Sequence, residues 1–177
     1  VGQTKEVQFS FDTKHGTDDY LEVIGGKTAS LIRTSAKLGA MASNSSPGLI
    51  ESISSWAWHS GIIFQITDDI LDLNSDTETL GKPAGNDILE GTYTLPVLLA
   101  LEKDRIKIED ILHQVKNSEI ELVEVLQEFN NDEIVEESNK FVNHHFKQSN
   151  EAIKNIEDKK ISNILNNINE YLLQRSN

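Results

Sequence analysis

Three carboxylates are grouped in one short segment, and their spacing would place them on one side of a helix. Asp68, Asp69 and Asp72 lie in the sequence QITDDILD, which begins at Gln65. At the rotation of an α-helix, these carboxylates and Gln65 share an arc of roughly 100°. Like charges this close destabilise a helix unless a cation neutralises them. Oxygen ligands without a neighbouring histidine or cysteine favour Mg²⁺, which shares its coordination sphere with substrate phosphates.

The alternative interpretation of the triplet is a solvated acidic surface, because the chain has 29 acidic residues against 16 basic ones. Two neighbouring features favour a site instead. The sequence GKPAGND, at residues 81–87, is a glycine-rich loop whose Lys82 could close over a phosphate together with backbone amides. Lys27 and Thr28 form a second lysine–hydroxyl pair, on a segment that can pack beside the aspartate helix. Together these features predict a site for a metal ion and a phosphate.

The elements that position these residues are predicted to be helices. No long stretch alternates apolar and polar residues as an exposed strand does, and the chain has only 3 prolines. Ser46 and Pro47 predict the start of a long helix that ends near Leu73, followed by a loop over 74–93. Amphipathic helices then follow one another to the carboxyl end. We therefore expect an all-α protein, an antiparallel helical bundle.

Composition and charge exclude several classes of protein. A net charge of −13 argues against binding nucleic acid, which requires a basic face. No apolar run is long enough for a transmembrane segment, and the absence of cysteine fits a reducing compartment. A length of 177 residues suits a single domain or part of one. We expect a cytoplasmic protein.

The order and spacing of several segments resemble the trans-isoprenyl (polyprenyl) diphosphate synthase family. The segments are GKTASL from Gly26, FQITDDILD from Phe64, LGKPAGNDI from Leu80, and TLP from Thr94. The resemblance implies an all-helical fold of the isoprenoid synthase type around a deep cavity, usually in a homodimer. It also implies that residues 1–177 are the carboxyl-terminal part of one polyprenyl synthase domain that lacks its N-terminal helices.

The resemblance also implies roles for individual residues. Asp68, Asp69 and Asp72 would form the second aspartate-rich motif and hold Mg²⁺. Lys27 and Lys82 would contact the allylic diphosphate. The same match assigns catalytic roles to Lys27, Lys82 and Asp68, and places Thr28 and Gln65 beside the substrate. The reaction would join an allylic diphosphate to isopentenyl diphosphate and give longer trans-polyprenyl diphosphates.

The chain departs from the family pattern in two respects. The first aspartate-rich motif belongs to an upstream half, so we expect this chain alone to be inactive in elongation. The family commonly has a lysine where this chain has Thr92, which places one diphosphate contact in doubt. The residues that set product length lie mainly near the first motif. The tail, with Tyr171 to Arg175, resembles the family's final helix, and we expect the carboxyl end to be complete.

Two other functions are compatible with the sequence. One is a noncatalytic helical partner that binds a synthase and modulates its product length. The other is an acidic interaction bundle that binds calcium weakly. We expect Trp56 and Trp58 to serve packing, and we expect no metal role for His144 and His145.

Overall fold

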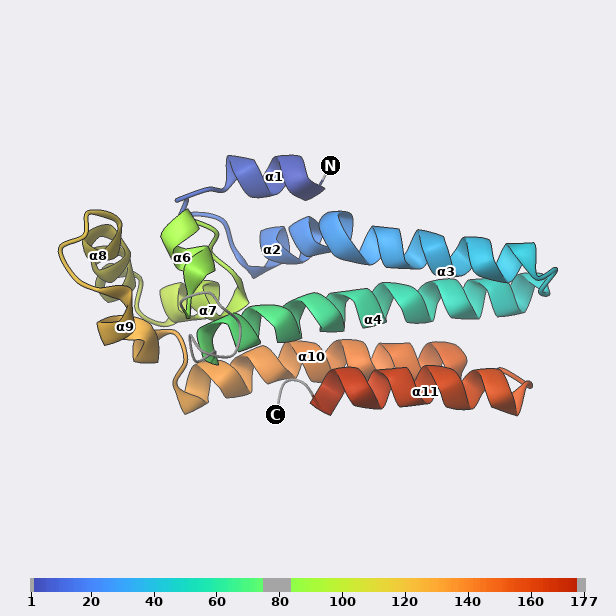
Figure 1. Ribbon diagram of the computed structural model, residues 1–177. Helices are drawn as coiled ribbons and strands as arrows, with labels where there is room; N and C mark the ends of the chain where they lie inside the picture. Colours follow the sequence, from blue (N-terminus) through green and yellow to red (C-terminus); the bar gives the residue numbers. More distant parts are fainter. Residues whose placement is uncertain (1, 75–83, 175–177) are drawn as a thin grey trace.

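The computed structural model describes residues 2–74 and 84–174. In those ranges the chain forms helices and no strand, which confirms the all-α prediction. Figure 1 shows them as a long bundle with a cluster of shorter helices at one end. The elements are α1 (Gly2–Gln8), α2 (Thr17–Ile24), the π-helical turn η1 (Gly25–Ala29), α3 (Ser30–Ala42), α4 (Pro47–Asn74), α6 (Asn86–Glu90), α7 (Leu95–Lys103), α8 (Arg105–Lys116), α9 (Leu122–Val125), the 3₁₀ turn η2 (Leu126–Glu128), α10 (Asp132–Ile153) and α11 (Lys159–Gln174).

Helix α4 is the central element of the bundle. It lies between α3 on one side and α10 and α11 on the other; α3 and α10 run antiparallel to α4, and α11 runs antiparallel to α10 (Figure 1). Its apolar side chains are buried on more than one face, as Ile62, Ile63 and Ile66 show with exposed fractions of 2% or less. Burial on several sides is typical of a helix in a protein core. This packing holds α4 in one orientation relative to its neighbours.

The predicted start of α4 is confirmed. Pro47 is its first residue, and the hydroxyl of Ser46 accepts a hydrogen bond from the amide of Leu49 at 3.3 Å. Proline suits this position because its missing amide proton has no helical partner there. The helix continues to Asn74 and therefore carries the whole aspartate triplet.

Close backbone contact joins η1 to α4. A Cβ atom added to Gly61 would lie 2.7 Å from Cα of Ala29, and one added to Gly25 would lie 2.9 Å from the ring of Trp58. Both distances are too short for a side chain, so glycine is required at these approaches. The contact explains why η1 lies against α4, and it places Thr28 within reach of Gln65.

The predicted loop over 74–93 is wrong in one part, because Asn86–Glu90 forms the short helix α6. The glycines on either side, Gly85 and Gly91, both adopt positive φ angles of 71° and 80°. Such angles let the chain turn sharply at both ends of a short helix. The first part of the expected loop, including Lys82, lies outside the described residues.

A buried polar cluster joins α4 to α10 and α11. The side-chain oxygen of Asn169 accepts hydrogen bonds from Trp56 at 2.9 Å, Ser60 at 3.0 Å and Ser149 at 2.8 Å. Its amide nitrogen donates to Asn150 at 2.7 Å. We call these five residues the Asn169 cluster. Because these buried polar groups have hydrogen-bond partners, the cluster fixes the position of α11 on the bundle.

None of the described helices combines enough length with enough apolar character to cross a membrane.

Candidate functional site

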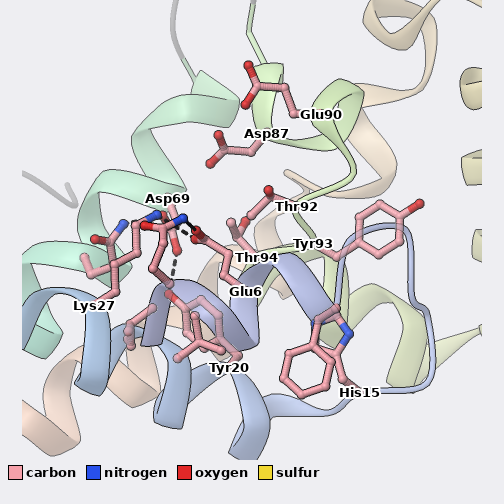
Figure 2. Close-up of a pocket in the computed structure, with 15 residues that line it drawn as sticks. Glu6, His15, Tyr20, Lys27, Asp69, Asp87, Glu90, Thr92, Tyr93 and Thr94 are labelled. Carbon is pink, nitrogen blue, oxygen red and sulfur yellow. Dashed lines mark hydrogen bonds and ion pairs between the residues drawn. The ribbon is translucent and has the colours of Figure 1, made fainter. Parts of the chain in front are cut away.

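A pocket of about 280 Å³ opens where α1 and α2 meet α4 and the segment that follows α6. Its wall is mostly polar, and its charged groups come from four separate elements (Figure 2). The residues that define its character are Glu6, Tyr20, Lys27, Gln65, Asp69, Asp87, Glu90 and Thr92. Of the predicted site residues, Lys27, Gln65 and Asp69 line this pocket.

Asp69 is held by side chains from two directions. The hydroxyl of Tyr20 donates a hydrogen bond to its Oδ2 at 2.6 Å, and Nε2 of Gln65 donates to its Oδ1 at 2.9 Å. Gln65 is fixed in turn, since its Oε1 accepts a hydrogen bond from Thr28 at 2.8 Å. We call these four residues the Asp69 network. Its members come from α2, η1 and α4, so correct packing of all three elements is needed to build it.

Burial changes the acidity of the groups in this network. It raises the pKa of Asp69 from 3.8 to about 7, against the opposing effect of the hydrogen bonds from Tyr20 and Gln65. Burial and the neighbouring Asp69 carboxylate raise the pKa of Tyr20 well above 10.0. The charged form of Asp69 is therefore energetically unfavourable at neutral pH, and a bound cation would stabilise it.

The positive charge of the pocket comes from Lys27. Its Nζ lies 2.6 Å from Oε1 of Glu6 on α1, and both side chains are partly accessible, at 37% and 17%. A second ion pair, between Lys5 and Glu22, joins α1 to α2. Lys27 therefore stands at the pocket wall with its charge available to an anion that competes with Glu6.

Asp87 on α6 adds a further carboxylate to the pocket wall. Burial first, and then the nearby Asp72, raise its pKa to about 6. The backbone oxygen of Asp87 accepts a hydrogen bond from the amide of Thr92 at 2.8 Å, which turns the chain after α6 back toward the pocket. The glycine-rich sequence thus brings an acid to the site, together with Thr92.

The aspartate triplet is divided by depth. Asp69 is 4% exposed, whereas Asp72 is half-buried and Asp68 is exposed. The sequence predicts a shared arc for the three, but it gives no indication of how neighbouring helices cover that arc. Asp69, the buried member, is the one that accepts a hydrogen bond from Tyr20 of α2. Lys82 lies outside the described residues, so its position relative to the triplet stays a prediction.

Sequence reasoning missed Tyr20, Glu6 and Asp87. Tyr20 precedes Lys27 by two helical turns, and this spacing places both on one helix face, so a signal was present. Asp87 was part of the glycine-rich motif but was given no role. Nothing in the sequence around Glu6 indicates its contact with Lys27, which depends on how α1 packs.

The donor chemistry of the pocket fits a hard divalent cation. Its acidic groups offer oxygen atoms only, and the one histidine in the wall, His15, stacks on Phe9. Within 2–74 and 84–174 no group of three or more acids, histidines or cysteines is arranged to hold an ion by itself. Mg²⁺ does not need such a cage, because it commonly uses one or two carboxylates, water and substrate phosphates.

The residues expected to serve packing occupy structural positions. Trp56 is 7% exposed and belongs to the Asn169 cluster, while the ring of Trp58 lies beneath the guanidinium of Arg33 at 5.8 Å. Nδ1 of His145 lies 2.9 Å from Nδ1 of His59, so this pair joins α10 to α4. The sequence did not indicate that contact.

Comparisons with known proteins place the chain among prenyl synthases. The family model described as polyprenyl synthetase matches residues 1–129. The heptaprenyl diphosphate synthase component 2 of Bacillus subtilis is 33% identical over 138 residues, which cover 78% of this chain and 40% of that protein. The short chain isoprenyl diphosphate synthase of Methanothermobacter thermautotrophicus is also 33% identical, over 98% of this chain and 54% of the relative.

Solved structures agree on the fold. The heptaprenyl diphosphate synthase of Staphylococcus aureus superposes with a TM-score of 0.89 and 28% identity, over 99% of this chain and 56% of the other. The chain thus spans about half the length, or less, of the relatives it matches. The family match covers most of the chain, and it contains the triplet, Lys27 and the Asp69 network. This chain is a member of the polyprenyl synthetase family.

Proposed function

We propose that this chain provides the diphosphate-binding wall of a Mg²⁺-dependent prenyltransferase. The reaction is the condensation of an allylic diphosphate with isopentenyl diphosphate to give longer trans-polyprenyl diphosphates. The observation that carries the proposal is the position of Lys27 and Asp69 in one pocket, with Asp69 fixed by hydrogen bonds. A cationic side chain beside a carboxylate is suited to a diphosphate that arrives with a divalent ion.

Each side chain has a definite task in this proposal. Asp68, Asp69 and Asp72 hold Mg²⁺, which when bound draws charge from the diphosphate leaving group. Lys27 gives up its contact with Glu6 and binds a diphosphate oxygen, and Lys82 binds another. Thr28 and Gln65 keep the carboxylate of Asp69 oriented. The allylic cation that remains is attacked by the double bond of isopentenyl diphosphate, and loss of a proton completes the step.

The chain supplies only part of this machinery. We propose that residues 1–177 are the carboxyl-terminal part of a single synthase domain, which acts as a homodimer. The relatives are about twice as long as the segment matched, and the first aspartate-rich motif implied by the resemblance has no counterpart in this sequence. Elongation is therefore a property of the complete synthase, whereas binding of diphosphate with Mg²⁺ belongs to this chain.

Substitution in the complete synthase tests the catalytic part of the proposal. Asp68→Ala or Lys82→Ala should lower turnover by about 100-fold or more, since each removes charge that stabilises the departing diphosphate. Lys37→Ala is the control, because Lys37 is exposed on α3 and does not line the candidate pocket. Turnover close to that of the unsubstituted enzyme in either site variant would contradict the proposal.

A second candidate function is a noncatalytic component of a two-chain synthase. It is supported by the name of the Bacillus subtilis relative, which describes that protein as component 2. A pure modulator needs no Mg²⁺ or diphosphate site, so it should give no heat when titrated with a diphosphate analogue and Mg²⁺. A binding isotherm would favour the first candidate.

A further inference from the structure

We infer that Tyr20 is a positioning residue of the site, which acts on the bound cation and diphosphate through Asp69. This inference rests on the proposed function and identifies a group that the sequence motifs do not contain. Tyr20 comes from α2, and Asp69 lies 49 residues away on α4. Their contact therefore depends on the packing of two helices.

The contact between them has the geometry of a strong hydrogen bond. The Tyr20 hydroxyl lies 2.6 Å from Oδ2 of Asp69, within the range of about 2.5–2.7 Å that is typical of a hydroxyl bound to a carboxylate. Both side chains are almost completely buried, at 4% exposure each. Little water competes for the carboxylate at this depth, so the tyrosine is its main partner on that oxygen.

Tyr20 and Gln65 together fix the plane of the carboxylate. They donate to different oxygens, at 2.6 Å and 2.9 Å, so the group cannot rotate without losing one bond. Each carboxylate oxygen has two lone pairs, and each donor uses one of them. The other lone pair on each oxygen stays available to a ligand in the pocket.

A purely structural role explains this arrangement poorly. An apolar pair of similar volume at these two positions would avoid burying a charge and is often as stable or more stable. The Asp69 network also borders the pocket, since both Tyr20 and Asp69 form part of the pocket wall (Figure 2). We therefore assign to the hydrogen bond from Tyr20 the role of orienting the Asp69 carboxylate toward a ligand in the pocket.

The chain offers a matched control in Tyr93. This tyrosine is also buried, at 6% exposure, and lines the same pocket. Figure 2 shows that its ring points away from Asp69. Tyr20→Phe and Tyr93→Phe both remove a phenolic hydroxyl from a tyrosine that lines the pocket, but only Tyr20→Phe removes a bond to the carboxylate.

The test measures the affinity of the chain for inorganic pyrophosphate in the presence of Mg²⁺ by calorimetry. Tyr20→Phe should weaken binding about tenfold, while Tyr93→Phe should leave it within about twofold. In an Asp69→Asn background the Tyr20→Phe substitution should add less than about twofold, since its effect passes through Asp69. Melting temperatures of all variants separate loss of binding from loss of folding.

A spectroscopic measurement complements the titration. The Tyr20 hydroxyl proton should give a downfield, slowly exchanging NMR signal that is absent in Tyr20→Phe and shifts when Mg²⁺ and pyrophosphate are added. Equal affinity of Tyr20→Phe and the unsubstituted chain, or additive effects of the two substitutions, would overturn the role of Tyr20 alone. Absence of binding by the unsubstituted chain would overturn the proposed function as well.

Discussion

Two buried polar networks lie along α4, and they differ in charge. The Asn169 cluster contacts the first half of the helix, at Trp56 and Ser60, and all its members are neutral. The Asp69 network contacts the second half and contains a carboxylate at the wall of a pocket. Neutral buried groups whose hydrogen bonds are satisfied stabilise a fold, whereas a buried charge reduces its stability unless a ligand compensates.

The difference separates stability from function in this protein. The Asn169 cluster holds α11 on the bundle and has no contact with the pocket. The Asp69 network holds an acid whose pKa is raised to about 7 by burial, which leaves little solvent to stabilise its charge. Retaining such a group lowers stability, and this cost is expected at a binding site.

The largest effect on folding should follow from breaking the neutral network. Asn169→Leu removes the shared acceptor of Trp56, Ser60 and Ser149 and leaves their donors buried without it. We expect the free energy of unfolding to fall by about 3 kcal/mol in chemical denaturation. Asn166→Leu, at an exposed position of the same helix, should change it by less than about 0.5 kcal/mol. A comparable loss of stability in both variants would contradict the claim that the Asn169 cluster stabilises the fold.

In the Asp69 network, removing the central polar group should raise the free energy of unfolding, not lower it. Asp69→Asn keeps the size of the side chain and removes a buried charge, so the free energy of unfolding at pH 7 should rise by about 1–2 kcal/mol. The same variant should lose most of its Mg²⁺-dependent affinity for pyrophosphate. Asp110→Asn, an exposed acid on α8, should alter neither property. A destabilised Asp69→Asn variant would mean that the carboxylate supports the fold, and the contrast between the networks would fail.

The smallest effect is a pH dependence from the contact between His59 on α4, next to Ser60 of the Asn169 cluster, and His145 on α10. Burial, and then the neighbouring His59, lower the pKa of His145 from 6.5 to about 4. Burial also lowers the pKa of His59, as does the nearby His144. Between pH 6.5 and 4 the unfolded chain binds more protons at His145 than the folded chain does. The contribution of the neutral His145 to stability is therefore present above pH 6.5 and is lost as the pH falls toward 4.

Replacing one partner tests this pH effect. His145→Gln should reduce the fall in unfolding free energy between pH 7 and pH 4 by about 1 kcal/mol, a value that allows for partial screening by solvent. His113→Gln, at an exposed site on α8, is the control. An unchanged pH profile in His145→Gln would show that the pair titrates as freely as exposed histidines do.

The sequence predicted the elements better than the contacts between them. The start of α4 at Pro47 followed from local chemistry, as did the position of the triplet on it. The unequal depth of Asp68 and Asp69 did not, because it depends on Tyr20 from another helix. Helix α6 was not predicted, because the two glycines beside it are typical of a loop. In the structure they form the ends of this short helix.

The site shows the same limit. The resemblance directed attention to Lys27, Thr28 and Gln65, and the structure places Thr28 and Gln65 in one network with Asp69. The contact of Glu6 with Lys27 depends on how α1 packs, for which the sequence gives no periodic signal. Local patterns thus identify groups that can bind a ligand, and tertiary packing decides which of them are fixed and which are accessible.

The most direct test of the central claim is a calorimetric titration of the 177-residue chain with a diphosphate analogue, with and without Mg²⁺. The proposal predicts saturable binding that requires Mg²⁺ and is much weaker, though still measurable, in Lys27→Ala and Asp69→Asn. Binding that is equally strong without Mg²⁺, or no heat in any condition, would contradict the claim that Lys27 and the carboxylates form a diphosphate site.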